Sequence, residues 1–299
     1  AFMIITQSLQ RYKKSMGVLS LKLLFLILHA LSHLPVCIFD FIAKKTASLI
    51  LMLLSKKRKT ILQRNIRLVF PEWGEQTVQH FIHKNILSLA TSMLQLSTIW
   101  RSPSTKWNKP VQLQGIHHLN KAESSPNGLI ILTPHFQNTE ILGQILKERL
   151  VKTSSYIYKP IKQQTLEQFT LNARGTLSIK SSETIKIVRT LKKGHTVLML
   201  PDQYMVDKHT AMVTFLGVQT QAITAPAKLI ALTKATILIA YIQETPKEYR
   251  LIIQPPLNPK LTGNFTQDTQ FICDCLSDVI LSQPHDYFWL HNRFKNIPI

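Results

Sequence analysis

Acidic residues and cysteines are both scarce in this sequence of 299 residues. There are 16 aspartates and glutamates against 36 lysines and arginines, which gives a formal net charge of +20 at pH 7. A chain this basic is expected to associate with something acidic: nucleic acid, anionic lipid or an acidic protein. Three cysteines exclude a disulfide framework. Cys273 and Cys275 lack a second pair of ligands nearby, so we expect reduced thiols in a cytosol-facing domain and no metal.

Internal repeats, low-complexity tracts and long linkers are also absent from the sequence. The aromatic residues are not interleaved with basic ones as a stacking platform for single strands requires, and this disfavours nucleic acid as the acidic partner. What is abundant is apolar: 45% of the residues are hydrophobic, enough for a sizeable core. The length allows one large domain or two small ones.

An apolar run at Leu23–Ala43 has the length that a bilayer requires. It is interrupted by polar residues and a proline, namely His29, His33, Pro35 and Asp40. Lysines flank it on both sides, and no A-x-A-like site follows it, so a cleaved signal peptide is not expected. Three interpretations stand: a single anchor with the bulk of the chain in the cytoplasm, two helices lying in the membrane interface, or a core helix of a soluble protein. We expect residues 1–60 to form the membrane unit and 61–299 the catalytic domain.

Helical and strand patterns alternate through the rest of the chain. Apolar residues at steps of three and four predict a long amphipathic helix from Val78 onward, and strand-like runs then separate helical ones up to the last helix around Cys273. This order predicts an α/β fold: a mixed, largely parallel sheet flanked by helices, with an N-terminal hydrophobic membrane-anchor helix. Two runs on either side of "ETPK" predict a hairpin. Sites in such sheets form beyond the carboxyl ends of strands, where the turns at His135 and at Asp202 both lie.

The stretch Leu129–Leu146 joins a strand-like run to a helical pattern through Pro134 and His135. Residues five apart do not face each other on a helix, so His135 can reach Glu140 only from a turn that folds back over the helix start. An imidazole is a natural base for an alcohol, and a carboxylate on its second nitrogen would orient it. No serine or cysteine is placed as a nucleophile, so a substrate hydroxyl would attack. A structural histidine at a strand end is the other interpretation.

Several motifs occur in the order that one family shows. They are "RNIRLVFPE", "GLIILTPHFQNTE", "YKP", "KKGHTVLMLPDQ", "FLG", "AITAPAKLIALTKA" and "PHDYFWLHNRFK". With these blocks the chain resembles, over nearly its whole length, the bacterial late lipid A acyltransferases, the lauroyl/myristoyl transferases of the lysophospholipid acyltransferase superfamily. Gln137 and Thr139 stand where many members have Gly and Trp, Lys159 replaces an Arg, and Asn292 occupies a position that is often basic. These departures bear on acceptor and chain-length preference.

The resemblance implies acyl transfer from acyl-acyl carrier protein to a hydroxyl of a lipid A precursor, without a cofactor, at the cytoplasmic face of the bacterial inner membrane. The residues that it implies are His135 as base, Glu140 as its orienting carboxylate, Arg174 as oxyanion donor or phosphate binder, Asp202 and Gln203 shaping the site, and Arg293 near lipid A phosphates. The alternatives are an acyltransferase for another glycolipid or phospholipid, and a non-catalytic, membrane-tethered protein that binds anionic lipid.

Overall fold

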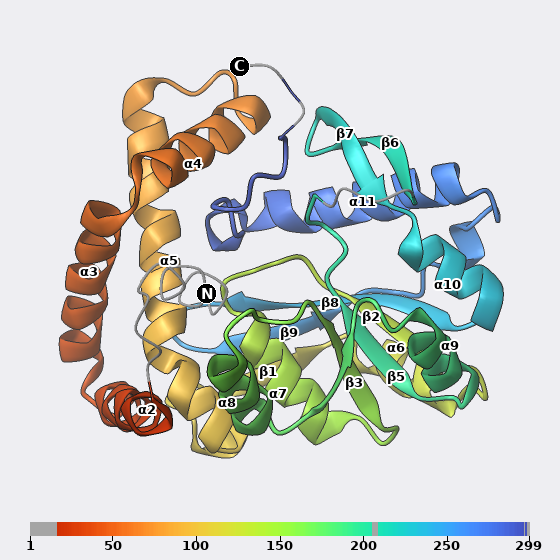
Figure 1. Cartoon of the computed structure of the whole chain (residues 1–299), viewed down its shortest axis with the longest axis horizontal. Helices are drawn as coiled ribbons and strands as arrows, with labels where there is room; N and C mark the ends of the chain where they lie inside the picture. The colour runs from red at the N-terminus through yellow and green to blue at the C-terminus, as the bar shows by residue number, and fades with distance from the viewer. Residues whose placement is uncertain (1–16, 205–208, 296, 298–299) are drawn as a thin grey trace.

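A seven-stranded sheet forms the centre of the computed structural model, which describes residues 17–204, 209–295 and 297 (Figure 1). The strand order is β1-β9-β8-β2-β5-β3-β4. β8 and β9 are antiparallel neighbours and the other pairs are parallel, which confirms the predicted mixed, largely parallel sheet and the predicted hairpin. The strands are β1 (Val111–Gln114), β2 (Leu129–Leu132), β3 (Ser154–Tyr158), β4 (Leu177–Lys180), β5 (Thr196–Met199), β8 (Thr236–Glu244) and β9 (Tyr249–Ile253). A separate antiparallel hairpin is made by β6 (Thr210–Phe215) and β7 (Val218–Ile223).

Helices cover both faces of the sheet. One core contains side chains of α6 (Ile116–Ser124), α7 (Thr139–Arg149) and α8 (Gln164–Arg174), and the other contains side chains of α9 (Thr184–Lys192), α10 (Ala225–Thr233) and α11 (Phe265–Ser282). β2 shows why both cores are needed. Leu129 and Ile131 point into the first core, whereas Ile130 and Leu132 point into the second, and all four are fully buried. A strand buried on both faces reads as a continuous apolar run, and "LIIL" is such a run.

The long amphipathic helix that the sequence predicts is α5 (Glu75–Arg101). Its 27 residues span about 40 Å, and it carries the amino-terminal helices on its outer side. These are α2 (Val18–Ser32), α3 (Val36–Leu53) and α4 (Lys56–Val69), which occupy the left of Figure 1. α2 and α3 both pack against α5.

The predicted membrane anchor is two helices rather than one. α2 ends at Ser32 and α3 begins at Val36, so the apolar run Leu23–Ala43 is broken in its middle. Pro35 explains the break, because proline lacks a backbone N–H and disfavours helical geometry in the residue before it. Among the described residues, no helix is both long and apolar enough to cross a bilayer. A spanning anchor helix is therefore not confirmed.

Candidate active site

The candidate site lies beyond the carboxyl ends of β2 and β5, which are neighbours in the sheet. Leu132 and Met199, the last residues of these strands, face each other in the parallel register. His135 and Asp202 each follow three residues later. Parallel neighbours end at the same edge of a sheet, so the register itself brings the two turns together.

Asp202 holds His135 through both carboxylate oxygens. Its Oδ1 lies 2.6 Å from Nδ1 of the His135 ring, and its Oδ2 accepts a hydrogen bond of 3.0 Å from the backbone N–H of the same residue. A carboxylate only accepts, so Nδ1 carries the ring proton and Nε2 keeps its lone pair. The His135 side chain is 24% exposed whereas that of Asp202 is fully buried. Nε2 is therefore the nitrogen that is available to a substrate.

The Asp202 carboxylate stays ionised although it is buried. Burial alone would raise the pKa of Asp202, but the charge and hydrogen bonds of His135, with a hydrogen bond from Tyr287, hold that pKa below its usual value. Burial and the charge of Asp202 raise the pKa of the Tyr287 hydroxyl well above its usual value, so this hydroxyl remains a donor. Asp202 thus receives one hydrogen bond from Tyr287 and two from His135, and a carboxylate with several donors keeps its charge.

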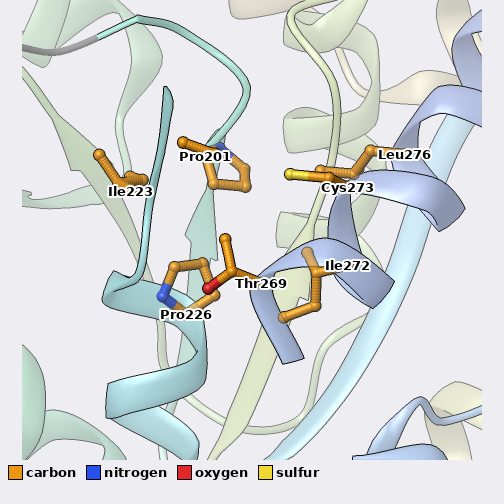
Figure 2. Close-up of a pocket in the computed structure, with 8 residues that line it drawn as sticks. Pro201, Ile223, Pro226, Thr269, Ile272, Cys273 and Leu276 are labelled. Atoms are coloured by element: carbon orange, nitrogen blue, oxygen red, sulfur yellow. The ribbon is translucent and has the colours of Figure 1, made fainter. Parts of the chain in front are cut away.

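A small apolar cavity adjoins Pro201, the residue before Asp202 (Figure 2). Its lining comes from the end of β5, from β7, α10 and α11, and consists of Pro201, Ala222, Ile223, Pro226, Thr269, Ile272, Cys273 and Leu276. Burial raises the pKa of the Cys273 thiol to about 12, so this cysteine is not a thiolate nucleophile at neutral pH. The lining of this cavity therefore supplies no ionised nucleophile.

Glu140 is not the carboxylate that orients His135. Its Oε1 accepts a hydrogen bond of 2.6 Å from Nη2 of Arg174, and its Oε2 accepts bonds of 3.0 Å from Nε of Arg174 and 2.9 Å from Nε1 of Trp100. The predicted pairing of His135 with Glu140 is therefore wrong. α7 begins at Thr139, and its first turn directs Glu140 toward α5 and α8 instead of back over the turn.

The Glu140 cluster is an ion pair enclosed by aromatic rings. Burial would raise the pKa of Glu140, but Arg174 and the Trp100 hydrogen bond hold it below its usual value. The Arg174 guanidinium lies 5.0 Å from the ring centre of Tyr156 and 5.8 Å from that of Trp100. Arg174 is thus engaged through Nε and Nη2, and it joins α8 to α5, β3 and α7. It is not the plain surface arginine that a basic chain could carry at this position.

Arg293 and Gln203 have different surroundings from each other. Arg293 is buried, and its Nη1 donates to Thr220 Oγ1 at 3.1 Å and to the Gln221 carbonyl at 2.7 Å. Its guanidinium lies 4.7 Å from the ring centre of Phe215. A side chain enclosed in this way does not present its charge to a phosphate at the surface, so the predicted contact with lipid A phosphates does not fit. Gln203 follows Asp202 and is half-buried at the site.

A C-terminal strap, residues 284–295, closes the site from the side of α4 and α5. Two asparagines hold it. Asn85 on α5 donates to the carbonyls of His285 and Tyr287 at 2.7 and 2.8 Å, and Asn65 on α4 donates to those of Trp289 and His291 at 2.7 and 2.6 Å. The strap opens with a short 3-10 helix at Pro284–Asp286 and continues through turns, so its carbonyls are not paired in a sheet and these two asparagines bind four of them.

The other side of the strap contacts the turn that contains His135. The backbone N–H of Phe288 donates to the His135 carbonyl at 2.9 Å, and that of Gln137 donates to the Asp286 carbonyl at 2.8 Å. These bonds seat Tyr287 against Asp202. The strap therefore fixes both the backbone of His135 and the hydroxyl that supports its carboxylate partner.

A second imidazole, that of His291, lies on the strap near His135. Burial and the positive charge of His135 lower the pKa of His291 to about 4, while a hydrogen bond to the backbone of Tyr204 opposes the shift. Its Nε2 is buried without a hydrogen-bond partner. His291 is therefore neutral at neutral pH and adds no positive charge beside His135.

The strap is the motif "PHDYFWLHNRFK" of the sequence, but its position beside His135 and its two asparagines were not predicted, although the sequence carried a sign of the asparagines. Asn85 lies in the apolar stripe of its helix, within "FIHKNI", and Asn65 lies in the corresponding place within "ILQRNI". Both are fully buried. A buried amide requires hydrogen-bond partners, so an asparagine in an apolar stripe predicts a polar contact across it. Within the described ranges, no three His, Cys, Asp or Glu side chains gather as metal ligands would.

Comparisons with known proteins agree with the order of the motifs. A family model described as bacterial lipid A biosynthesis acyltransferase matches residues 9–296. The lipid A biosynthesis palmitoleoyltransferase of Escherichia coli (strain K12) is 24% identical over 250 residues, covering 82% of this chain and 81% of that protein. The lauroyltransferase of the same organism is 24% identical, with 81% of each chain covered. A lipid A biosynthesis acyltransferase of Haemophilus influenzae is 23% identical over 243 residues, 79% of this chain and 75% of its own length.

Proposed function

The chain belongs to the bacterial lipid A biosynthesis acyltransferase family and is an acyltransferase, and from this premise we propose its reaction. A fatty acyl chain moves from acyl-acyl carrier protein to a hydroxyl of a lipid A precursor, as a late step of lipopolysaccharide biosynthesis. The observation that carries the proposal is the His135–Asp202 pair at the end of β2 and β5. It supplies a base of fixed tautomer with its reactive nitrogen outward.

The proposed reaction uses His135 twice. Nε2 of His135 takes the proton of the acceptor hydroxyl as its oxygen attacks the thioester carbonyl carbon. The new C–O bond forms, the tetrahedral intermediate collapses and the C–S bond breaks. The thiolate of the carrier then takes the proton back from Nε2. Asp202 stabilises the imidazolium between the two transfers, as a carboxylate on Nδ1 does in other acyl-transfer sites.

The tetrahedral intermediate needs hydrogen-bond donors for its oxyanion. Arg174 is the donor that we propose, because Glu140 binds its Nε and Nη2 and leaves Nη1 outside the ion pair. Glu140 in this proposal positions Arg174 instead of His135. Gln203, half-buried beside Asp202, shapes the acceptor side of the site.

We further propose that the enzyme works at the bacterial inner membrane with residues 61–299, its catalytic domain, facing the cytoplasm. Residues 1–60 form the membrane unit. A lipid acceptor and a strongly basic chain support a location at an anionic membrane. The same basic charge supports binding of the acyl carrier, which is taken to be an acidic protein.

Replacing His135 with Ala tests the reaction. We expect His135→Ala to fold and to lose transfer, and cells that depend on this variant should accumulate lipid A one acyl chain short, as measured by mass spectrometry. The matched control is His195→Ala, a histidine directly before β5 and at the opposite end of that strand from Asp202, which should leave the lipid A profile unchanged. Wild-type lipid A in cells with the His135 variant would overturn the proposal.

A glycolipid or phospholipid acceptor other than lipid A precursor is the competing function. "LPDQ" follows the His motif in this chain, whereas "FPE" precedes it, an order that does not favour a phosphatidate-type acceptor. Purified enzyme supplied with lipid A precursor or with lysophospholipid separates the two, since we expect acylation of the precursor alone.

A further inference from the structure

Large apolar side chains are exposed mainly on α2 and α3. Seven such side chains are spread over the rest of the described chain, whereas these two short helices carry ten. The ten are Leu19, Leu23, Leu26, Ile27, Val36, Ile38, Phe41, Leu49, Met52 and Leu53. Ten exposed large apolar side chains on two consecutive helices are uncommon on a surface in contact with water, and such a concentration marks a partner protein or a membrane.

Cationic side chains accompany this apolar surface. Exposed lysines occur before, between and after the apolar residues, at positions Lys22, Lys44, Lys45, Lys56, Lys57 and Lys59. Asp40 is the single acidic residue in the sequence from 17 to 71. A second copy of the chain would bring the same positive charge against this surface and would be repelled. Apolar side chains flanked by lysines instead match the hydrocarbon and the anionic head groups of a lipid leaflet.

The two helices lie along one outer face of the molecule. α3 runs upright at the left edge of Figure 1, and α2 lies below it, seen nearly end-on, with α5 to the right of both. α2 has 15 residues and is about 22 Å long, shorter than the roughly 30 Å of a bilayer core. Its inner side is fixed by Ser97, whose hydroxyl donates to the Phe25 carbonyl at 2.6 Å. Both helices can rest in one leaflet without leaving α5.

We propose that α2 and α3 lie in the plane of the membrane, in the interface of one leaflet that contains anionic lipid, and that neither crosses the bilayer. The surface formed by their ten exposed apolar side chains is termed the α2–α3 surface. It enters the head-group region while the lysines bind anionic head groups. This inference adds a membrane-binding surface to the proposed function. It rests on the proposed function in one respect, namely that a lipid acceptor is present at that membrane.

Flotation of the full-length protein with vesicles tests the α2–α3 surface. The protein should float with phosphatidylcholine vesicles that contain about one-third phosphatidylglycerol. Leu23→Gln, Phe41→Gln and Met52→Gln together, the apolar triple variant, should weaken binding more than about a hundredfold, since each change removes a large apolar side chain from the lipid. The matched control is Leu177→Gln, Ile185→Gln and Leu232→Gln, three side chains of similar exposure elsewhere, which should float like the wild type.

A second triple variant tests the charges. Lys44→Gln, Lys45→Gln and Lys59→Gln should weaken binding to the anionic vesicles about tenfold or more and leave binding to pure phosphatidylcholine unchanged. Equal flotation of the wild type and both triple variants would overturn the proposal. So would a wild type that does not float but forms a dimer that the apolar triple variant cannot form.

Cys37 distinguishes lying in one leaflet from spanning. It is exposed near the start of α3, whereas Cys273 is buried and Cys275 half-buried. In membrane vesicles of known orientation, a membrane-impermeant maleimide should label Cys37 from the face that carries the catalytic domain or from neither face. Cys37→Ser identifies the labelled thiol. Labelling from the opposite face would show that the chain crosses the bilayer and would overturn the proposal.

The acyltransferase assay separates this inference from the proposed function. In detergent micelles with lipid A precursor, the apolar triple variant should transfer acyl chains like the wild type, because its changes lie on α2 and α3, away from His135. If the wild-type protein floats with vesicles but transfers no acyl chain, the proposed function is wrong, whereas the inference about the α2–α3 surface is supported.

Discussion

The hydrogen bond between His135 and Asp202 predicts how transfer responds to a change of one atom. Asp202→Asn can present its NH2 group to Nδ1, which favours the ring tautomer with the proton on Nε2. The base is then blocked, and we expect kcat to fall about 10³- to 10⁴-fold. Steady-state rates on purified enzyme would measure this.

Tyr287→Phe provides the matched comparison at the same carboxylate. It removes the hydroxyl bond to Asp202 and leaves the His135–Asp202 bond in place, so kcat should fall only about tenfold, with the KM for the lipid acceptor unchanged. If Asp202→Asn were as active as Tyr287→Phe, Asp202 would not be the partner of the base.

His291 predicts a loss of stability in mild acid. Its pKa is about 4 in the folded protein and about 6.5 in the unfolded chain. Between these values the unfolded chain binds a proton that the folded protein does not, so the free energy of unfolding falls as pH drops from about 6.5 to about 4, by about 3 kcal/mol in all. His291→Asn keeps a donor for the Tyr204 carbonyl but does not titrate in this range. Denaturant midpoints at about pH 7 and about pH 4.5 should differ less in the variant; equal differences would contradict the assignment.

At the scale of elements, the Glu140–Arg174 pair joins α7 and α8 and contacts α5 through Trp100. Glu140→Met leaves the mostly buried Arg174 without its carboxylate, and we expect a loss of about 3–5 kcal/mol in the free energy of unfolding. Arg174→Met should cost a similar amount. The double variant Glu140→Met/Arg174→Met removes both charges and should recover most of the loss. Thermal unfolding of the four proteins measures the coupling, and additive losses would show that the pair does not act as a unit.

Elements with a strong local pattern were predicted well, and the strap was not. α5 follows from its apolar period, and the β8–β9 hairpin follows from two strand-like runs around a short turn. The segment 284–295 has no period, because its shape comes from Asn65 and Asn85, which precede it by about 200 residues. The break of the predicted anchor at Pro35 was visible in the sequence, but an apolar run of suitable length outweighed it.

At the scale of the whole molecule, the net charge of +20 predicts a salt-sensitive reaction. Association with the proposed donor, an acidic carrier protein, would be accelerated by long-range attraction, which salt screens. The KM for acyl-acyl carrier protein should therefore rise about tenfold between about 0.05 M and about 0.5 M NaCl. An acyl thioester of neutral pantetheine is the control, and its KM should stay constant. An equal response of the two donors would show that the carrier is not bound through charge.

The sequence by itself determined the fold class, the family and His135, because periodicity, turn residues and the order of motifs are local properties of a chain. The resemblance also marked Asp202, which the structure places on His135, and Arg174, whose place in the site stays a prediction. Only the tertiary structure decided which carboxylate binds His135 and which binds Arg174. The register of β2 against β5 places Asp202 within hydrogen-bonding distance of His135. The direction of the first turn of α7 places Glu140 within hydrogen-bonding distance of Arg174. Five residues along the chain separate His135 from Glu140 and sixty-seven separate it from Asp202, yet hydrogen bonding depends on distance in space, which the pairing of strands sets.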